Sequence, residues 1–249
     1  MITALVLGGG KATRLGGVDK LAIVVGGRTI LERQRAALAG RVAEILVATP
    51  RPLPPLPPLA GAPALRTVAD AVPDAGPLAG IAAGLAAAHT PWLLVLAGDM
   101  PDVRGDVLDL LASQISIDTT DTADTADSAD SADSTDSADS ADSTDSTDST
   151  DSPDSPDTAD SPDTADSADS TAGADAVGIR IGGLAEPLCC LLRVAAARPH
   201  VDALLAAGRY KASLLLEGLR VAWLDEARLR AVDPELRSLR NVNRPEDLR

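Results

Sequence analysis

One segment of this 249-residue chain cannot contribute to a hydrophobic core. From Asp118 to Ser170 the sequence is a triplet repeat of Asp, then Ser or Thr, then Ala, Ser, Thr or Pro. It holds 18 Asp and no Lys, Arg, aromatic or large aliphatic residue. Low hydrophobicity combined with like charge predicts a disordered insertion. The 196 residues outside the repeat are enough for a single domain with a sizeable core.

The same repeat accounts for the formal net charge of −15. Outside it the chain has 22 basic and 19 acidic residues, which leaves the rest close to +3. No basic patch is interleaved with aromatic residues, and the chain has no Phe and one Tyr. We therefore expect no nucleic-acid partner that binds by base stacking.

The cysteines, the first residues and the lengths of the apolar runs indicate the cellular compartment in which the protein is expected. Cys189 and Cys190 are adjacent in an apolar run, so we expect them to be buried on opposite faces of a strand rather than to bind metal. The first residues lead directly into a glycine-rich loop, which indicates a first strand rather than a signal peptide. No apolar run reaches the roughly 20 residues of a membrane span, so a cytoplasmic protein without a membrane partner is expected.

Short apolar runs alternate with segments of helical period, a pattern typical of an α/β fold. We predict a Rossmann-like, mostly parallel sheet flanked by helices, in a single domain with the long insertion. The expected strands are 2–7, 43–48, 64–68, 92–96, 176–180, 188–193 and 221–224. The expected helices are 29–39, 77–89, 103–115, 194–206 and 211–217. Six prolines between residues 51 and 63 predict an extended connection.

A glycine-rich loop follows the first strand. Gly8, Gly9 and Gly10 let the backbone approach a polyanion, and Arg14 and Lys20 supply positive charge, so the loop is interpreted as a phosphate cradle. It does not match a Walker A loop, which has Gly-Lys-Ser/Thr, or the Gly-x-Gly-x-x-Gly fingerprint of dinucleotide-binding folds.

A second candidate site follows the apolar strand that ends near residue 96. Asp99 comes directly after it, so its carboxylate is expected at the carboxyl edge of the sheet, where open α/β folds bind ligands. Mg²⁺ prefers one or two carboxylates together with phosphate oxygens and water. We therefore predict that Asp99 is a magnesium ligand.

The loop resembles the signature Leu-x-Gly-Gly-x-x-x-Arg-x-Gly-x-x-Lys of nucleotidyltransferases that make sugar nucleotides, cytidylyl alcohols and molybdopterin dinucleotides. The lysine comes one residue later here, as is typical of the molybdenum cofactor guanylyltransferase family, which the chain resembles. Further similar segments are Val68–Asp70 with Gly76–Gly80, Glu186–Leu188 and Asn241–Leu248.

The resemblance implies transfer of GMP from GTP to the phosphate of molybdopterin, with release of pyrophosphate. Residues 1–117 would form the nucleotide-binding half of the domain, 118–170 the insertion and 171–249 the acceptor-binding half. The partners it suggests are GTP, molybdopterin, and molybdoenzymes or cofactor-insertion proteins. The residues matched by position are Arg14, Lys20 and Asp99 for catalysis; Leu7, Gly8, Gly9, Gly10, Lys20, Asp70 and Asp99 for GTP; Asp99 for metal; and Asn241 and Asn243 for the acceptor.

Alternatives from within and outside this enzyme class are compatible with the same residues. The cradle would also serve a molybdopterin cytidylyltransferase or a sugar-phosphate nucleotidyltransferase. A nucleotide-binding module without activity is a further alternative, although such a module would not need Asp99.

Overall fold

The computed structural model describes residues 1–9, 19–53, 55–70, 76–115, 173–242 and 247. Both ends of the Asp repeat, and everything between them, lie outside these ranges, so the predicted disorder stays a prediction. The elements described below belong to one unit formed by residues 1–117 and 170–249.

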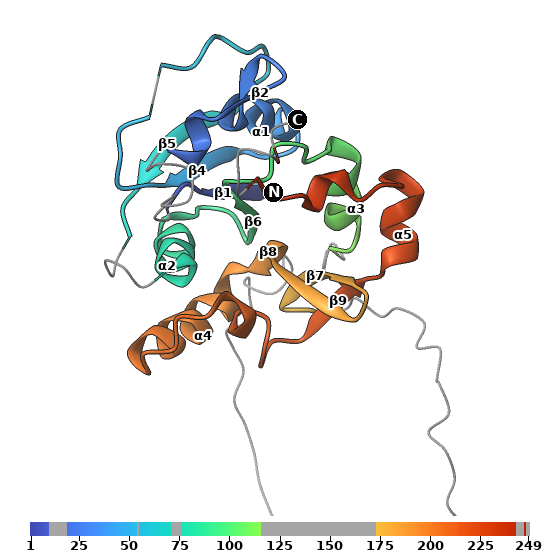
Figure 1. The fold of residues 1–249 in the computed structure, drawn as a ribbon. Helices are drawn as coiled ribbons and strands as arrows, with labels where there is room; N and C mark the ends of the chain where they lie inside the picture. Colours follow the sequence, from blue (N-terminus) through green and yellow to red (C-terminus); the bar gives the residue numbers. More distant parts are fainter. Residues whose placement is uncertain (10–18, 54, 71–75, 116–172, 243–246, 248–249) are drawn as a thin grey trace, which may run out of the picture. The chain divides into compact units, whose positions relative to one another are not determined.

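The centre of this unit is a seven-stranded sheet with the order β5-β4-β1-β6-β8-β7-β9 (Figure 1). Strand β8 is antiparallel to both of its neighbours, and every other neighbouring pair is parallel, which confirms the mostly parallel α/β sheet. The strands are β1 Ile2–Leu7, β4 Glu44–Ala48, β5 Ala64–Val68, β6 Trp92–Ala97, β7 Ala176–Ile181, β8 Leu184–Arg193 and β9 Val221–Leu224.

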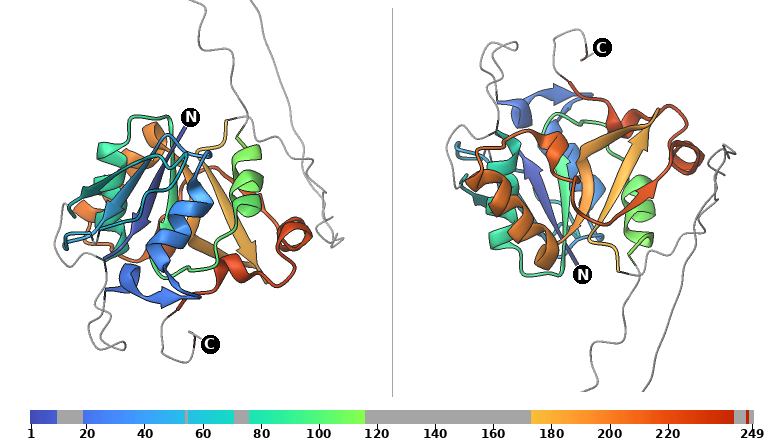
Figure 2. Two further views of the ribbon diagram at one scale, coloured as in Figure 1. Left: turned by 90° about the horizontal axis from the view of Figure 1, so that it is seen from above. Right: turned by 90° about the horizontal axis from the view of Figure 1, so that it is seen from below.

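Helices cover both faces of the sheet (Figure 2). One core contains buried residues of α1, α3 and α5, and the other contains buried residues of α2 and α4. The helices are α1 Ile30–Leu38, α2 Pro77–Ala87, α3 Gly105–Ser113, α4 Val194–Ala206 and α5 Glu226–Val232. The short 3-10 turns are η2 Lys20–Ala22, η3 Ala212–Leu214 and η4 Arg237–Leu239.

Local sequence explains where two of these helices begin. Thr29 caps α1 through a capping box with Glu32: each side chain accepts a hydrogen bond from the other residue's backbone N–H. Helix α2 begins at Pro77, directly after Gly76, which has a φ of +68° that a glycine adopts without strain. The first turn of α2 lies near the carboxyl ends of β1 and β4, because a Cβ atom built on Gly80 would lie 3.0 Å from Leu7 Cδ2 and 3.1 Å from Ala48 Cβ.

Most predicted elements are present, and the differences have local causes. The segment expected to be a helix at 211–217 contains only η3, so that expectation is wrong. Its sequence lacks a capping side chain, and a single turn already buries Leu215 and Leu216. A two-stranded hairpin, β2 Val24–Val25 and β3 Arg28–Thr29, forms around Gly26 and Gly27.

The cysteines lie as expected, on opposite faces of β8. Cys189 belongs to the core with α1, α3 and α5, and Cys190 belongs to the core with α2 and α4. Burial raises the pKa of the Cys189 thiol to about 12 and raises that of Cys190 further. Both thiols are therefore protonated, apolar core groups at neutral pH. Among the described helices, none is long and apolar enough to cross a membrane.

Candidate functional site

The carboxyl ends of β1, β4 and β6 lie side by side and are tied together by backbone hydrogen bonds. The amide of Gly8 donates to the carbonyl of Ala48 at 2.8 Å, and the amide of Gly98 donates to the carbonyl of Leu7 at 3.0 Å. The Gly8 amide, expected to hold phosphate, is thus engaged in the strand ladder. A phosphate cradle in this loop would begin at Gly9.

Leu21 fills the space that two of these glycines leave open. A Cβ atom at Gly8 would lie 2.5 Å from Leu21 Cδ1, and one at Gly98 would lie 3.0 Å from Leu21 Cδ2. Leu21 is completely buried, and Asp19 caps its turn by accepting a hydrogen bond from the Leu21 amide at 3.0 Å. This anchor fixes the preceding residue, Lys20, above the strand ends.

Lys20 and Asp99, 79 residues apart in the chain, meet at this edge. Lys20 Nζ donates to Asp99 Oδ2 at 2.6 Å, and the two side chains are 22% and 14% exposed. Asp99 is not a helix cap, because α3 begins at Gly105 with Arg104 as its N-cap residue. The contact places one cation and one carboxylate together at the expected ligand edge.

Two further contacts hold the backbone around Asp99. Gln34 of α1 is completely buried, and its Nε2 donates to the carbonyls of Ala97 at 2.8 Å and Met100 at 3.0 Å. The amide of Val242 donates to the Asp99 carbonyl at 2.8 Å. Gln34 was not predicted from the sequence, where it is one polar residue in an amphipathic helix. Val242 brings the chain between the two candidate acceptor asparagines next to Asp99.

Asp70 lies at the end of β5, next to Gly9 and Gly80. Cβ atoms built on these glycines would lie 3.8 Å and 3.3 Å from its carboxylate oxygens. Burial raises the pKa of Asp70, and its Oδ1 is buried without a hydrogen-bond partner among the described residues. A carboxylate in this state favours a ligand that donates hydrogen bonds to it.

The acidic residues at this edge suit a metal shared with a substrate. Within the described ranges, no group of three or more His, Cys, Asp or Glu side chains could hold a metal ion. Mg²⁺ commonly uses one or two protein carboxylates and takes its other ligands from phosphate and water. Asp99, partly exposed at the sheet edge, fits that role.

The predicted site residues divide into three groups. Lys20, Asp99, Asp70 and Gly9 lie at the carboxyl edge, where Leu7 closes β1 and Gly8 follows it. Asn241 is exposed directly before Val242. Gly10, Arg14 and Asn243 lie outside the described residues.

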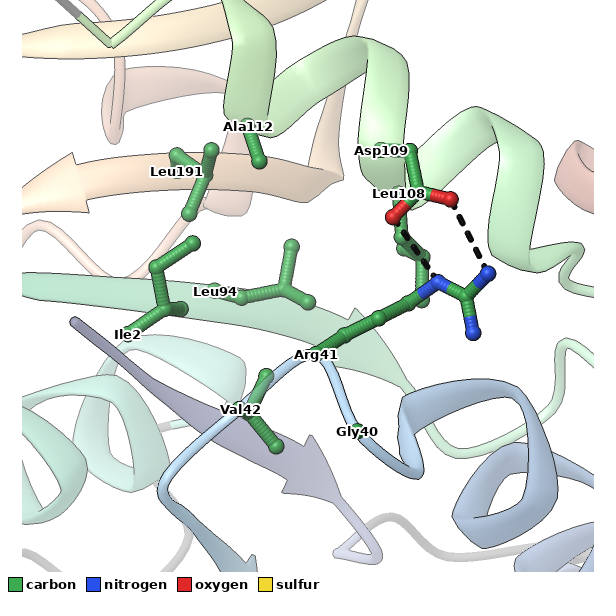
Figure 3. Close-up of a pocket in the computed structure, with 9 residues that line it drawn as sticks. All are labelled: Ile2, Gly40, Arg41, Val42, Leu94, Leu108, Asp109, Ala112 and Leu191. Carbon is green, nitrogen blue, oxygen red and sulfur yellow. Dashed lines mark hydrogen bonds and ion pairs between the residues drawn. The ribbon is translucent and has the colours of Figure 1, made fainter.

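A separate cavity of about 260 Å³ lies near the amino end of β1 (Figure 3). Ile2, Leu94 and Leu191 line it, and Arg41 forms a two-fold ion pair with Asp109 at 2.9 Å on its rim. Ile2 starts the strand whose other end carries Gly8, so this cavity is not part of the Asp99 site.

Sequence comparison assigns the family. Residues 4–222 match the family described as MobA-like NTP transferase domain. The chain belongs to this family. A MobA-like NTP transferase domain is a nucleotidyltransferase, which agrees with the glycine-rich loop and the carboxylate at the sheet edge. A comparison with curated protein sequences gave no match.

Solved structures share the fold of this MobA-like domain at low identity. Molybdopterin-guanine dinucleotide biosynthesis protein A from Archaeoglobus fulgidus superposes with a TM-score of 0.62 and 21% identity, over 99% of this chain and 94% of that one. A nucleotidyl transferase from Methanothermobacter thermautotrophicus gives 0.55 and 19%, over 99% and 94%. The 2-C-methyl-D-erythritol 4-phosphate cytidylyltransferase from Thermus thermophilus gives 0.51 and 17%, over 98% and 94%.

Proposed function

We propose that this nucleotidyltransferase moves GMP from GTP to the phosphate of molybdopterin, with release of pyrophosphate. The observation that carries the proposal is the contact between Lys20 and Asp99 at the carboxyl edge. The guanylyltransferase motifs around Gly76–Gly80 and Asn241–Val242 favour GTP and molybdopterin over the other substrates of this enzyme class.

In the proposed reaction, an oxygen of the acceptor phosphate attacks the α-phosphorus of GTP. The bond from that phosphorus to the bridging oxygen of the β-phosphate breaks, and the electron pair leaves with pyrophosphate. A phosphate monoester is largely ionised near neutral pH, so no general base is required. The enzyme's contribution is then to position the reactants and to stabilise charge.

Each residue at the edge has a defined part in this proposal. The amide of Gly9, with Gly10 and Arg14, would hold the triphosphate, and Lys20 would neutralise the charge developing on pyrophosphate. Asp99 would hold Mg²⁺, which supplies positive charge to the phosphate oxygens when bound. Asp70 would accept hydrogen bonds from the nucleotide, and Asn241 and Asn243 would contact the acceptor.

A nucleotide panel tests the proposal. Purified protein with Mg²⁺ is given GTP, CTP, ATP or UTP, with or without molybdopterin, and pyrophosphate release is followed. Release that requires both GTP and molybdopterin supports guanylyl transfer. Pyrophosphate release with CTP instead of GTP would assign cytidylyl transfer. No release with any nucleotide would favour the alternative of a nucleotide-binding module without activity.

The roles of the edge residues are tested by substitution. Loss of one charge contact to a transition state costs about 10²- to 10³-fold in rate, so we expect Asp99→Asn, Lys20→Ala and Arg14→Ala to lower kcat by that order. Asp109→Asn, which breaks an exposed ion pair with Arg41, is the matched control and should retain full activity. An Asp99→Asn enzyme with more than about a third of normal turnover would contradict the assignment.

A further inference from the structure

Glu186 of β8 is a half-buried carboxyl group to which no role has been assigned. Burial raises the pKa of its carboxyl group, and within the described part of the chain no hydrogen bond or ion pair of the Glu186 side chain is found. Its environment thus offers no compensation for its charge. A partner that donates hydrogen bonds would supply that compensation.

The strand order places Glu186 toward the sheet edge that carries Asp99. Strands β6 and β8 are antiparallel neighbours, and their pairing ends at Leu96 with Cys189. Glu186 lies three residues beyond Cys189, in the direction of the carboxyl end of β6. Asp99 comes two residues after that end. Glu186 and Asp99 therefore both lie toward the carboxyl edge, with Glu186 on a strand of the proposed acceptor-binding half.

An irregularity in β8 turns Glu186 toward one face of the sheet. Alternation from Cys189 and Cys190 would place Glu186 on the face of α2 and α4. Instead the β7–β8 register shifts, and Glu186 pairs with Ile179, whose side chain belongs to the core with α1, α3 and α5. Facing residues of an antiparallel pair share a face of the sheet. Bulges of this kind occur next to active sites, where they redirect a side chain.

Two nearby residues stabilise the shifted segment. Pro187 has no amide to donate to a ladder, and Cys190 Sγ donates to the Pro187 carbonyl at 3.2 Å. The shift is thus built into the sequence directly after Glu186.

We propose that Glu186 recognises the acceptor by accepting hydrogen bonds from adjacent N–H groups of its heterocycle. This inference rests on the proposed function, in which the acceptor is a pterin. A pterin presents an amino group and a ring N–H side by side, and a carboxylate accepts two such donors at once. Glu186 is a binding residue in this proposal and takes no part in the transfer of GMP.

The test compares Glu186→Gln and Glu186→Ala with wild type and with Glu235→Gln, a control that removes an exposed carboxylate paired with Arg237. KM for molybdopterin, KM for GTP and kcat are measured separately. We expect KM for molybdopterin to rise about tenfold or more in both Glu186 variants, with KM for GTP unchanged. An unchanged KM for molybdopterin, or an equal rise of both KM values, would overturn the inference.

A second measurement separates this inference from the proposed function. The fluorescence of 6-hydroxymethylpterin is titrated with wild type and with both Glu186 variants, in the absence of nucleotide. Binding that is at least tenfold weaker in the variants supports the role of Glu186, even if wild type transfers no GMP. If wild type transfers GMP and all variants bind the pterin equally well, Glu186 is excluded as an acceptor-binding residue and the proposed function stands. Absence of both transfer and pterin binding in wild type would overturn both.

Discussion

At the scale of single residues, two carboxylates at one sheet edge lie in opposite environments. Asp99 is paired with Lys20, whereas one oxygen of Asp70 is buried without a partner among the residues described. The sequence predicts Asp99 and Lys20, because each follows a recognisable strand or loop motif. The burial of Asp70 could not be predicted, since it depends on Gly80, which is near in space and lacks a side chain.

Asp70→Asn should stabilise the folded protein at neutral pH and weaken GTP binding. Burial raises the pKa of Asp70, so the folded state holds its proton to higher pH than the unfolded state, and stability falls as pH rises between the two values. Removing the charge should increase the free energy of unfolding at pH 7 by about 1 kcal/mol, which corresponds to a rise in Tm of about 2–4 °C.

The pH dependence provides the control for this prediction. Below the ordinary pKa of about 3.9, Asp70 is protonated in both states, so the two proteins should have the same Tm there. Thermal melts of wild type and variant from about pH 3 to pH 8 measure the difference, and GTP titration measures the loss of affinity. A Tm gap that is constant with pH would contradict the explanation.

The two cysteines should resist alkylation in the folded protein. The thiolate is the reactive form, and burial raises the pKa of Cys189 to about 12 and that of Cys190 also. With iodoacetamide at pH 8 we expect no modified cysteine in native protein and two in denaturant, as counted by mass spectrometry. Rapid modification of the native protein would show that β8 opens.

At the scale of elements, the site depends on how closely strand ends approach one another. Composition and periodicity predicted the sheet strands, and three of them, β1, β5 and β9, have the predicted bounds. Their order and the antiparallel direction of β8 could not be predicted from local pattern, because pairing depends on residues far apart in sequence. The close packing of Leu21 against both Gly8 and Gly98 could likewise not be predicted from the sequence.

Gly98→Ala and Gly9→Ala should therefore have different effects. A Cβ at Gly98 would meet the carbonyl oxygen of Leu7, a backbone atom that has no room to move, and we expect a loss of about 2 kcal/mol in unfolding free energy. A Cβ at Gly9 makes an ordinary contact with Asp70 at 3.8 Å, so stability should change by less than about 0.5 kcal/mol.

Nucleotide binding supplies the complementary measurement. In Gly9→Ala the added methyl group occupies space where the backbone would approach phosphate, and we expect about tenfold weaker GTP binding from a stable protein. Urea denaturation and GTP titration of both variants make the comparison. Equal loss of stability in the two variants would refute the role given to the close contact between Gly98 and the carbonyl of Leu7.

At the scale of the whole molecule, the acidic repeat dominates the charge of the chain and lies outside the described residues. The sequence separates it from the folded domain because it offers no aromatic or large aliphatic side chain to bury. Residues on both sides of it join one sheet, β6 before it and β7 to β9 after it. The family match also runs across it, from residue 4 to residue 222. We propose that the domain folds and transfers nucleotide without it.

Replacing residues 119–169 by a short Gly/Ser linker tests this proposal. Loop-closure entropy depends weakly on length, so we expect Tm to change by less than about 3 °C and kcat to stay within about twofold. A full-length protein carrying Asn for every Asp of the repeat is the control for charge alone. Loss of transfer in both variants would assign the repeat's charge a part in the reaction.

The near absence of aromatic side chains makes the protein's optical properties simple. The chain has no Phe, one Tyr and two Trp. Trp92 starts β6 with 6% exposure beneath Arg193, and Trp223 lies on the edge strand β9 with Arg180 at 4.0 Å from its ring. The two indoles thus report on strands that precede and follow the acidic repeat. With Trp223→Leu or Trp92→Leu, emission from the remaining indole would follow each half of the domain separately without any added label.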